Sequence, residues 1–476
     1  MRERGVFLFH RDLRTSDNSA LIKLAQMGVD IIPVFIFDPV QISAKKNAYF
    51  SNPAVQFMCE SLESLNAQVD GRLVVLHGDT LTVLRSLHKH VPFSRIAYNL
   101  EWTAFGRARD AKIAEWAEKA KVDVVTAEDY YLTDVLPEKP YKVLSAFWKW
   151  FLKNKPARLV DEYSKFTFVN EGAKTASLAK LYTKFYKPMP DIAMHGGRAL
   201  ALERLAALKN MKDYGETRDF PANKRGTTHL SPYIKFGCVS IREVYWSGVK
   251  TLGSESPFLR ELVFRDFYAR IYAESAALQH GKVAILDKLD KELGWYSAAS
   301  HAHLWEAWTT GQTGFPLVDA GMRELLSTGH QHGRVRMLCA CVLTKYFWID
   351  WREGLKFYYT HLVDADVFSN TAGWGFSSST GADAVPYFRA PFNPFRQSHK
   401  FDKAAEYIKH WVPELRDVDA KDIHNWFDEG VRERVASKYP APIVDFAQAS
   451  KNAVIRFKEA AKTLQGSCPK IKIHRA

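Results

Sequence analysis

Short apolar runs alternate with amphipathic segments over the first 130 residues. Five runs have the length and the β-branched and aromatic content of buried strands, at residues 5–10, 30–38, 72–78, 95–102 and 123–129. Segments with helical spacing lie between them, as at residues 18–28 and 52–68. This alternation predicts a parallel sheet with helices on both faces, which is the α/β class.

The loop after the first predicted strand is a candidate site. It covers residues 10–18 and reads HRDLRTSDN. Ligands of parallel sheets lie at the carboxyl ends of the strands, which is where this loop begins. The loop has no GxGxxG motif, so a dinucleotide fingerprint is not supported there.

From about residue 200 onward the apolar spacing becomes helical. Apolar residues recur at i, i+3, i+4 and i+7 in residues 259–275, 313–329 and 335–347. Prolines interrupt both patterns between residues 132 and 199, where one helix around 144–153 stands out. The sequence therefore predicts an α/β domain over 1–131, a connector over 132–199 and an all-helical domain over 200–476.

Composition agrees with a globular protein of two or three domains. The 476 residues are 47% apolar and 25% charged. Aromatic residues make up 13%, with 13 tryptophans among them, and such side chains stack on flat ligands and bases as well as filling cores. The net charge of +13 favours a polyanionic partner, nucleic acid above all, although many basic proteins bind none.

The five cysteines are scattered and form neither a CxxC pair nor a zinc-binding spacing. This usage is typical of a reducing compartment. The apolar run in the opening residues is too short for a signal peptide, and no apolar run in the sequence is long enough to cross a membrane. We therefore expect a soluble intracellular protein, in the cytoplasm or nucleus, with no metal site.

Residues 364–378 read DADVFSNTAGWGFSS and bring together carboxylates, an amide and an indole. Asp366, Asn370 and Trp374 would share one face of a helix. Gly373 and Gly375 make a regular helix that far unlikely. The alternative is a helix end, with Asp as a cap, Asn in a turn and Trp packed beneath a glycine-rich loop.

Two further stretches leave a choice between structural and functional interpretations. The hydroxyls of Thr227, Thr228 and Ser231 precede a helix start that favours an anion, but an ordinary capping turn explains them too. Glu261 and Arg265 stand four residues apart, either as a surface salt bridge or, among apolar neighbours, on a partly buried face.

A third stretch, residues 327–337, contains two histidines and two arginines. His330 and His332 lack a third ligand and are weak evidence for a metal. Arg334 and Arg336 offer forked donors for phosphate or carboxylate groups.

In order along the chain, FLFHRDLRTSDNSAL, TTHLSPYIKFG, TGFPLVDAGMREL, IDWREG and STGADAVPYFR resemble the DNA photolyase/cryptochrome flavoprotein family. The resemblance runs from residue 5 to about residue 415, and IDWREG, residues 364–370 and the KFD at 400–402 look most like cyclobutane-dimer photolyases. It implies a Rossmann-like antenna domain and a helical domain that holds FAD. The implied function is blue-light repair of cyclobutane pyrimidine dimers in DNA, by electron transfer from photoexcited reduced FAD.

By position, the resemblance assigns the FAD contacts to Tyr214, Thr227, Thr228, His229, Leu230, Ser231, Phe258, Glu261, Arg265, His330, Gly333, Arg336, Asp364, Asp366 and Asn370. Arg336 and Asp364 would pair beside the flavin ring, Asp366 would take a ring N–H or sugar contact, and Asn370 would face the flavin N5.

The resemblance also assigns catalytic and DNA-binding roles. Trp374, Trp351 and Trp295 would carry electrons to the flavin, with Tyr296 as the alternative to Trp295 because this region is two residues longer than the family pattern. Glu261 would stabilise the charge that develops on the lesion. The DNA contacts would be Glu261, Phe264, Arg334, Met337, Phe376, Arg389 and Arg396.

The chain departs from the family at several of these positions. Phe264 and Phe376 stand where dimer photolyases often have tryptophans, which puts substrate affinity in doubt. Gly333 replaces a usual asparagine, and Gly333 and Met337 replace the histidines of the (6-4) branch. Gly106 replaces a carboxylate of folate-binding relatives, so a second antenna chromophore, of folate or deazaflavin type, is expected without a settled identity.

Two other functions compete with dimer repair. A cryptochrome photoreceptor is disfavoured because only about 60 residues follow WVPEL, too few for a long signalling tail. An unrelated nucleotidyl-transfer enzyme is disfavoured by the lack of a P-loop. Repair of (6-4) photoproducts is the weaker alternative within the family. We expect a monomer that binds damaged DNA and no membrane.

Overall fold

The computed structural model describes residues 3–466 except 134, 136, 139–140, 155, 160–162, 164, 171–183 and 383–390. The chain divides into two compact units. Unit 1 comprises Met1–Lys212, Thr228–Ala276 and Val363–Asp366, and unit 2 comprises Asp213–Thr227, Ala277–Leu362 and Val367–Ala476. The domain boundaries expected from the sequence, at 131 and 199, stay predictions.

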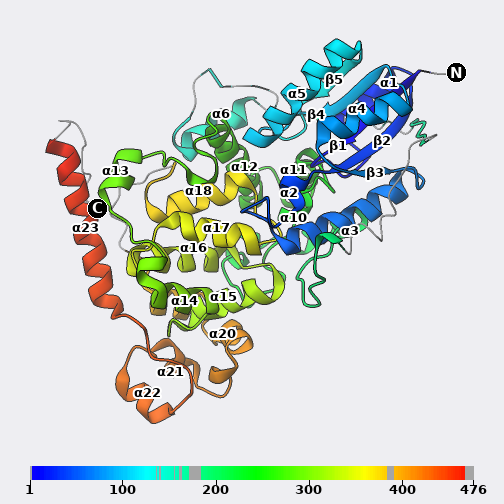
Figure 1. Cartoon of the computed structure of the whole chain (residues 1–476). Helices are drawn as coiled ribbons and strands as arrows, with labels where there is room; N and C mark the ends of the chain where they lie inside the picture. The colour runs from blue at the N-terminus through cyan, green and yellow to red at the C-terminus, as the bar shows by residue number, and fades with distance from the viewer. Residues whose placement is uncertain are drawn as a thin grey trace. The chain divides into compact units, whose positions relative to one another are not determined.

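A five-stranded parallel sheet forms the centre of the N-terminal part of unit 1 (Figure 1). Its strands are β1 (Arg4–Phe9), β2 (Asp30–Phe37), β3 (Val74–His77), β4 (Arg95–Asn99) and β5 (Asp123–Ala127). They lie in the order β3-β2-β1-β4-β5, and every neighbouring pair is parallel. The α/β class predicted from the alternation of apolar runs is confirmed.

The connections between these strands contain helices that begin at side-chain caps. They are α1 (Ser19–Gln26), α2 (Pro39–Ile42), α3 (Asn52–Gln68), α4 (Thr80–His90) and α5 (Ala104–Ala120). Asn18, Ser51, Asp79 and Thr103 each accept a backbone N–H from the first turn of the helix that follows. Apolar residues of α4 and α5 join those of the strands in one buried core.

The remaining helices of unit 1 are α6 (Leu144–Asn154), α8 (Arg198–Ala206), η1 (Ala207–Asn210), α10 (Ser231–Lys235), α11 (Ile241–Leu252) and α12 (Pro257–Ala273). The helix expected around 144–153 is therefore present. It packs on α12 through the rings of Phe147 and Phe267, whose centroids are 5.6 Å apart.

The described residues of unit 2 form helices and loops, with one isolated bridge between Tyr296 and Ile349. The helices are α9 (Tyr214–Thr217), η2 (Gln279–Gly281), α13 (Asp287–Glu292), η3 (Ala299–His301), α14 (Ala302–Thr310), α15 (Pro316–Thr328), α16 (Gly333–Cys341), η4 (Val342–Tyr346), α17 (Trp351–His361), α18 (Val367–Ser378), α19 (Pro394–Phe401), α20 (Glu406–Trp411), η5 (Pro413–Leu415), α21 (Ala420–His424), α22 (Glu429–Val435) and α23 (Phe446–Gly466). The helical character predicted for the C-terminal part is confirmed.

The expectation that glycines end the helix after Asn370 is wrong. Helix α18 continues through Gly373 and Gly375 to Ser378. Tertiary packing overrides the low helix propensity of glycine here. The Trp374 ring lies against α17, where a Cβ on Gly354 would come within 2.2 Å of it, and an added Cβ on Gly381 would come within 2.6 Å of the Gly375 backbone.

The predicted helix over 335–347 is present but changes its winding. After α16, residues Val342–Tyr346 form a π-helical turn. Trp348, just beyond it, has a φ of +58° and is buried. Among the described residues, no helix is both long and apolar enough to cross a bilayer.

Candidate functional site

Helix α16 of unit 2 turns one face away from the core. Gly333 is exposed and Arg336 and Met337 are half-buried, whereas Val335 and Cys339 are buried. A Cβ added to Gly333 would meet nothing within 4 Å. The Arg336 Nε donates to the Gln331 carbonyl at 2.7 Å, which fixes the guanidinium at this face.

Helix α18 packs on α16 and has a similar open face. Asn370 and Phe376 are half-buried and Gly373 is exposed, at a spacing that puts the three side by side on the helix. A Cβ on Gly373 would also meet nothing within 4 Å. The Asn370 amide donates to the Leu355 carbonyl at 3.1 Å and is thereby oriented. Bare backbone beside an oriented amide and a guanidinium suits a flat polar ring such as a flavin.

A tight turn leads to Thr227, the last residue of the first segment of unit 2. Gly226 donates to the Asn223 carbonyl at 2.8 Å, and a Cβ on Gly226 would come within 2.7 Å of the Thr217 carbonyl oxygen. Tyr214, one of the expected FAD residues, is buried beneath Arg218, whose guanidinium lies 5.9 Å from the ring centre.

Some of the expected FAD residues of unit 1 lie at the start of α10. Ser231 begins this helix and donates its hydroxyl to the Asp364 carboxylate at 2.6 Å. Thr228 accepts the Leu230 N–H at 3.4 Å, and His229 has a φ of +52°. Ser231 and Asp364 are thus brought together, while the expected Arg336–Asp364 pair joins residues of different units and stays a prediction.

On helix α12, Glu261 is exposed, and Phe264 and Arg265 are half-buried. Phe258, in the first turn of the helix, is buried. Arg265 lies over the Tyr130 ring at 3.7 Å and donates to the Tyr130 carbonyl at 2.8 Å. The partly buried face expected at this helix is therefore present around Arg265, with Glu261 at its exposed edge.

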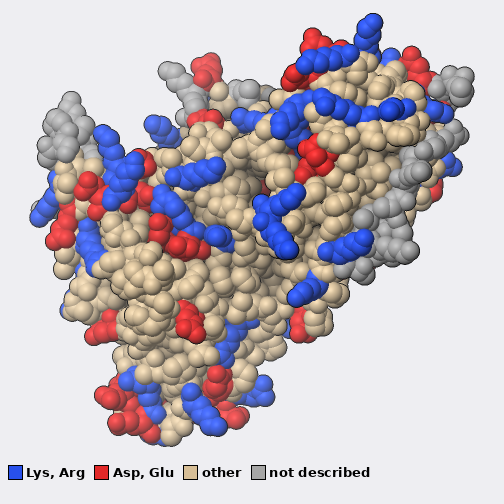
Figure 2. Space-filling model, viewed as in Figure 1, with Lys and Arg blue, Asp and Glu red and all other residues tan. Residues whose placement is uncertain are grey.

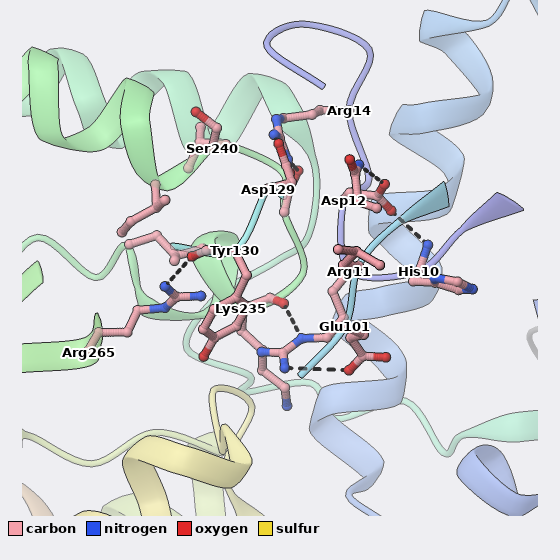
Figure 3. Close-up of a pocket in the computed structure, with 16 residues that line it drawn as sticks. His10, Arg11, Asp12, Arg14, Glu101, Asp129, Tyr130, Lys235, Ser240 and Arg265 are labelled. Atoms are coloured by element: carbon pink, nitrogen blue, oxygen red, sulfur yellow. Dashed lines mark hydrogen bonds and ion pairs between the residues drawn. The ribbon is translucent and has the colours of Figure 1, made fainter. Parts of the chain in front are cut away.

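The loop after β1 lines a separate pocket at the carboxyl ends of β1 and β4 (Figure 3). Arg11 extends between Glu101, at 3.8 Å, and the Lys235 carbonyl, at 3.0 Å. Arg11 also pairs with Asp366 at 2.5 Å. Asp366, expected at the flavin, thus has a partner in this pocket.

Burial in this pocket shifts two pKa values. It lowers the pKa of Lys235 to about 7, with a further contribution from the positive charge of Arg11. It also raises the pKa of Asp12 to about 6 against the backbone hydrogen bond from His10. Glu101 lies directly over Gly106, where an added Cβ would come within 2.7 Å of its side chain. A carboxylate is therefore present beside the position where folate-binding relatives carry one.

Apart from the loop 10–18 and Arg265, which was expected at the FAD, the residues of this pocket were not predicted as site residues. Arg11 and Lys235 are 224 positions apart in sequence, so only the tertiary fold brings them together. The HRDLR segment directly after a strand was the available signal.

The three expected relay tryptophans lie in unit 2 among other aromatic rings. Trp374 is buried and lies 5.1 Å from the Tyr358 ring and 6.2 Å from that of Trp308. Trp351 is buried against Gly281, where a Cβ would come within 2.5 Å of the indole and where φ is +66°. Trp295 is half-buried, and its ring centre lies 5.0 Å from that of Trp348.

The histidines of residues 327–337 and the arginines expected to contact DNA have varied surroundings. His330 pairs with Glu324 at 3.1 Å, and His332 caps α16 by accepting the Arg334 N–H at 3.2 Å, so both have structural partners. Arg334 pairs with Asp219 at 2.7 Å. Arg396 is exposed on α19. Arg389 lies outside the described residues.

On the face drawn in Figure 2, lysine and arginine side chains are interspersed with carboxylates, clearly so around α21 and α22 at the lower end. The net charge of +13 is therefore not gathered into one uniform patch on this face.

Comparison with known proteins agrees with this arrangement. Residues 5–162 match the family model described as DNA photolyase, and residues 258–459 match the FAD binding domain of DNA photolyase. The deoxyribodipyrimidine photo-lyase of Halobacterium salinarum is 31% identical, over 96% of this chain and 99% of its own length.

Solved structures show the same likeness. The archaeal photolyase from Sulfolobus tokodaii, described with two FAD molecules, is 33% identical with a TM-score of 0.84, over 96% of this chain and 100% of that one. The bacterial class III photolyase from Agrobacterium tumefaciens is 30% identical with a TM-score of 0.86, over 97% of this chain and 98% of that one. A cryptochrome from Synechocystis shares the fold at 24% identity and a TM-score of 0.82.

A parallel-sheet region followed by a helical FAD-binding domain defines a light-active flavoprotein class. The chain belongs to the DNA photolyase family, as the resemblance of its motifs implied.

Proposed function

We propose that the protein uses blue light to split cyclobutane pyrimidine dimers in DNA, through an electron from photoexcited reduced FAD. The main support is the pair of open faces on α16 and α18. There Arg336 and Asn370 stand beside Gly333 and Gly373, where an added Cβ would meet nothing within 4 Å. The relatives that align over nearly the whole chain include proteins named deoxyribodipyrimidine photo-lyase.

In this proposal the chain's own residues hold and tune the cofactor. When bound, FAD supplies the light-excited electron. Asn370, whose amide is oriented by its hydrogen bond to the Leu355 carbonyl, would contact the flavin ring. Ser231, Asp364 and the threonine turn before them hold the phosphate and sugar side. The other FAD contacts are those assigned by position in the family motifs.

The proposed substrate contacts are those that the family motifs assign by position. Glu261 reaches the lesion carbonyls and stabilises the negative charge that develops on them. Phe264, Met337 and Phe376 each offer an apolar side chain to the flipped-out dinucleotide. Arg334, Arg389 and Arg396 contact phosphates on either side.

Trp374, Trp351 and Trp295 would carry electrons to bound FAD before repair. Indole is the most easily oxidised of the ordinary side chains. The buried positions of Trp374 and Trp351 and the half-buried position of Trp295 support a path from inside unit 2 to its surface.

Light harvesting by a second chromophore is not part of this proposal. The pocket of unit 1 has a volume of about 40 Å³. Sites for ligands of drug size have roughly 300–1,000 Å³. A tricyclic or folate pigment does not fit that pocket as it stands, so the expected antenna and its identity stay predictions.

A repair assay tests the proposal. Purified protein should carry FAD in a one-to-one ratio and, after reduction, remove cyclobutane dimers from DNA under blue light and not in the dark. Oligonucleotides with a (6-4) photoproduct should stay unrepaired. Bound FAD without light-dependent loss of dimers would favour a photoreceptor. We also propose that it acts as a monomer in the compartment that houses DNA, cytoplasm or nucleus.

A further inference from the structure

One buried carboxylate of unit 2 contacts two of the relay tryptophans at once. Asp290, on α13, has only 4% of its surface exposed. Its Oδ1 accepts the indole N–H of Trp351 and that of Trp295, each at 2.9 Å. Because both indole nitrogens lie 2.9 Å from the same oxygen, the distance between them is at most the sum of these two distances. Sequence reasoning did not single out this residue.

The charges around Trp351 leave a net negative environment at its N–H edge. The other Asp290 oxygen accepts from Arg352 at 2.5 Å. Arg352 also pairs with Asp350 at 3.2 Å, so two carboxylates share one guanidinium. Burial lowers the pKa of Arg352, but the hydrogen bond to Asp290 and the charge of Asp350 raise it above its ordinary value.

The aromatic rings beyond Trp295 have the opposite environment. Trp348 donates its indole N–H to the neutral Leu293 carbonyl at 3.0 Å. The Arg456 guanidinium lies 4.7 Å from the Trp348 ring centre and 4.9 Å from that of Tyr296. A positive charge on Trp348 or Tyr296 is therefore repelled by the Arg456 cation, whereas one on Trp295 is attracted by the Asp290 carboxylate. A positive charge on Trp351 is attracted by the same carboxylate and repelled by the Arg352 guanidinium, which lies 4.6 Å from its ring centre.

We infer that Asp290 is the counter-charge of the tryptophan relay, and that the electron vacancy comes to rest on Trp295. This inference rests on the proposed function. Trp374 gives one electron to the photoexcited oxidised flavin, Trp351 refills Trp374, and Trp295 refills Trp351. Each step moves a single electron and breaks no bond. Asp290 acts through the indoles as a positioning residue, because it orients both N–H groups and stabilises the cation radical on either ring.

The first test needs no flavin. In protein labelled with ¹⁵N at tryptophan, the indole N–H resonances of Trp295 and Trp351 should both move in Asp290→Asn, which removes the charge at constant size. The matched control is Asp287→Asn on the same helix, whose partner Lys291 is an exposed side chain at 2.7 Å. Both resonances should stay in place in the control. If neither moves in Asp290→Asn, the shared acceptor is refuted.

The second test follows the indole radical after a light pulse on the oxidised holoprotein. In Asp290→Asn the yield of long-lived radical should fall about tenfold, because a unit charge a few ångströms away is lost. In Arg352→Gln the yield should rise, because Asp290 is left uncompensated and the cation 4.6 Å from the Trp351 ring centre is removed. This opposite sign keeps the inference testable even if Asp290→Asn fails to fold.

Two results overturn the inference: an unchanged radical yield in Asp290→Asn, or a fall in Arg352→Gln. Dimer repair by chemically reduced protein bypasses the relay and should be normal in both variants. A wild type that fails this repair assay contradicts the proposed function, whereas normal repair with unchanged radical yields contradicts only the role of Asp290.

Discussion

At the scale of single residues, the exposed position of Glu261 on α12 makes its contribution separable from folding. We expect Glu261→Ala to keep FAD but to lower the quantum yield of dimer repair by at least about twofold, because a charge-stabilising group is lost where charge develops. Repair under calibrated blue light is the measurement. Glu255→Ala, an exposed carboxylate just before α12, is the control and should repair as the wild type does. Equal yields in the two variants would remove Glu261 from the mechanism.

Gly373 offers a test of where the flavin lies. Its Cβ position is open, so Gly373→Ala should raise the stability of the cofactor-free protein by about 0.5–1 kcal/mol through helix propensity alone. Gly373→Leu should still fold but lose FAD, because its side chain fills the space beside Asn370. Urea unfolding and the flavin absorbance per protein are the measurements. Stoichiometric FAD in Gly373→Leu would place the ring elsewhere.

Gly354 is the matched contrast to Gly373 on the neighbouring helix. A Cβ there would come within 2.2 Å of the buried Trp374 ring. Gly354→Ala should therefore lower the free energy of unfolding by about 1–3 kcal/mol through overpacking. The same substitution of glycine by alanine should therefore raise the free energy of unfolding at Gly373 and lower it at Gly354.

Lys235 gives the stability of the protein a pH dependence of known sign. Its pKa is lowered from 10.5 to about 7 in the folded protein, so the unfolded chain binds more protons between these values. The contribution of Lys235 to the free energy of unfolding therefore increases as the pH rises. Relative to Lys235→Met, the wild type should gain about 1–2 kcal/mol in free energy of unfolding between pH 7 and 9. Lys291→Met is the control, because Lys291 is exposed, and its free energy of unfolding should change with pH as that of the wild type does. If Lys235→Met also showed the wild-type change with pH, Lys235 would not be buried.

At the scale of helices, α17 and α18 carry the inner part of the tryptophan relay. Trp351→Phe should abolish most photoreduction of oxidised FAD while leaving repair by chemically reduced protein intact, because phenylalanine is much harder to oxidise. Loss of both activities would contradict the relay role. Photoreduction is followed by the flavin spectrum under continuous blue light.

Two further tryptophans, on helix α14, offer a second electron path to Trp374. The Trp308 ring lies 6.2 Å from Trp374 and 5.6 Å from the half-buried Trp305. Any residual photoreduction in Trp351→Phe should therefore disappear when Trp308→Phe is added. Residual photoreduction that survives the second change would require a donor outside both branches.

The elements themselves show what a sequence reveals and what it hides. The five strands and the long helices α3, α12 and α15 were predicted from apolar periodicity, because burial on a sheet or helix face imposes that period directly. The continuation of α18 through Gly375 was missed, since the packing that stabilises it comes from other segments of the chain. Asp290 was missed for the same reason: it lies 61 positions from Trp351, its hydrogen-bond partner.

At the scale of the whole molecule, the sequence pattern again predicted local structure but not the contacts between distant segments. The change from alternating strands to helical spacing at about residue 200 is real, yet unit 1 also includes Thr228–Ala276 from the helical region. Such grouping depends on contacts distant in sequence, as between α6 and α12, and no periodicity encodes them. Family motifs supplied the candidate flavin residues, because the open faces of α16 and α18 look like ordinary amphipathic helices in sequence.

The net charge of +13 predicts how binding to DNA depends on salt. Each phosphate contact contributes about 0.9 to the slope of log affinity against log salt concentration on duplex DNA. Arg396 is exposed on α19, so Arg396→Gln should reduce the slope by about one contact and weaken damaged and undamaged DNA alike. Arg434→Gln is the control, because this exposed arginine is paired with Asp422 at 2.7 Å. Fluorescence anisotropy titrations at several salt concentrations measure the slope. If both variants keep the wild-type slope, Arg396 makes no phosphate contact; if Arg396→Gln weakens only damaged DNA, it contacts the lesion rather than the backbone.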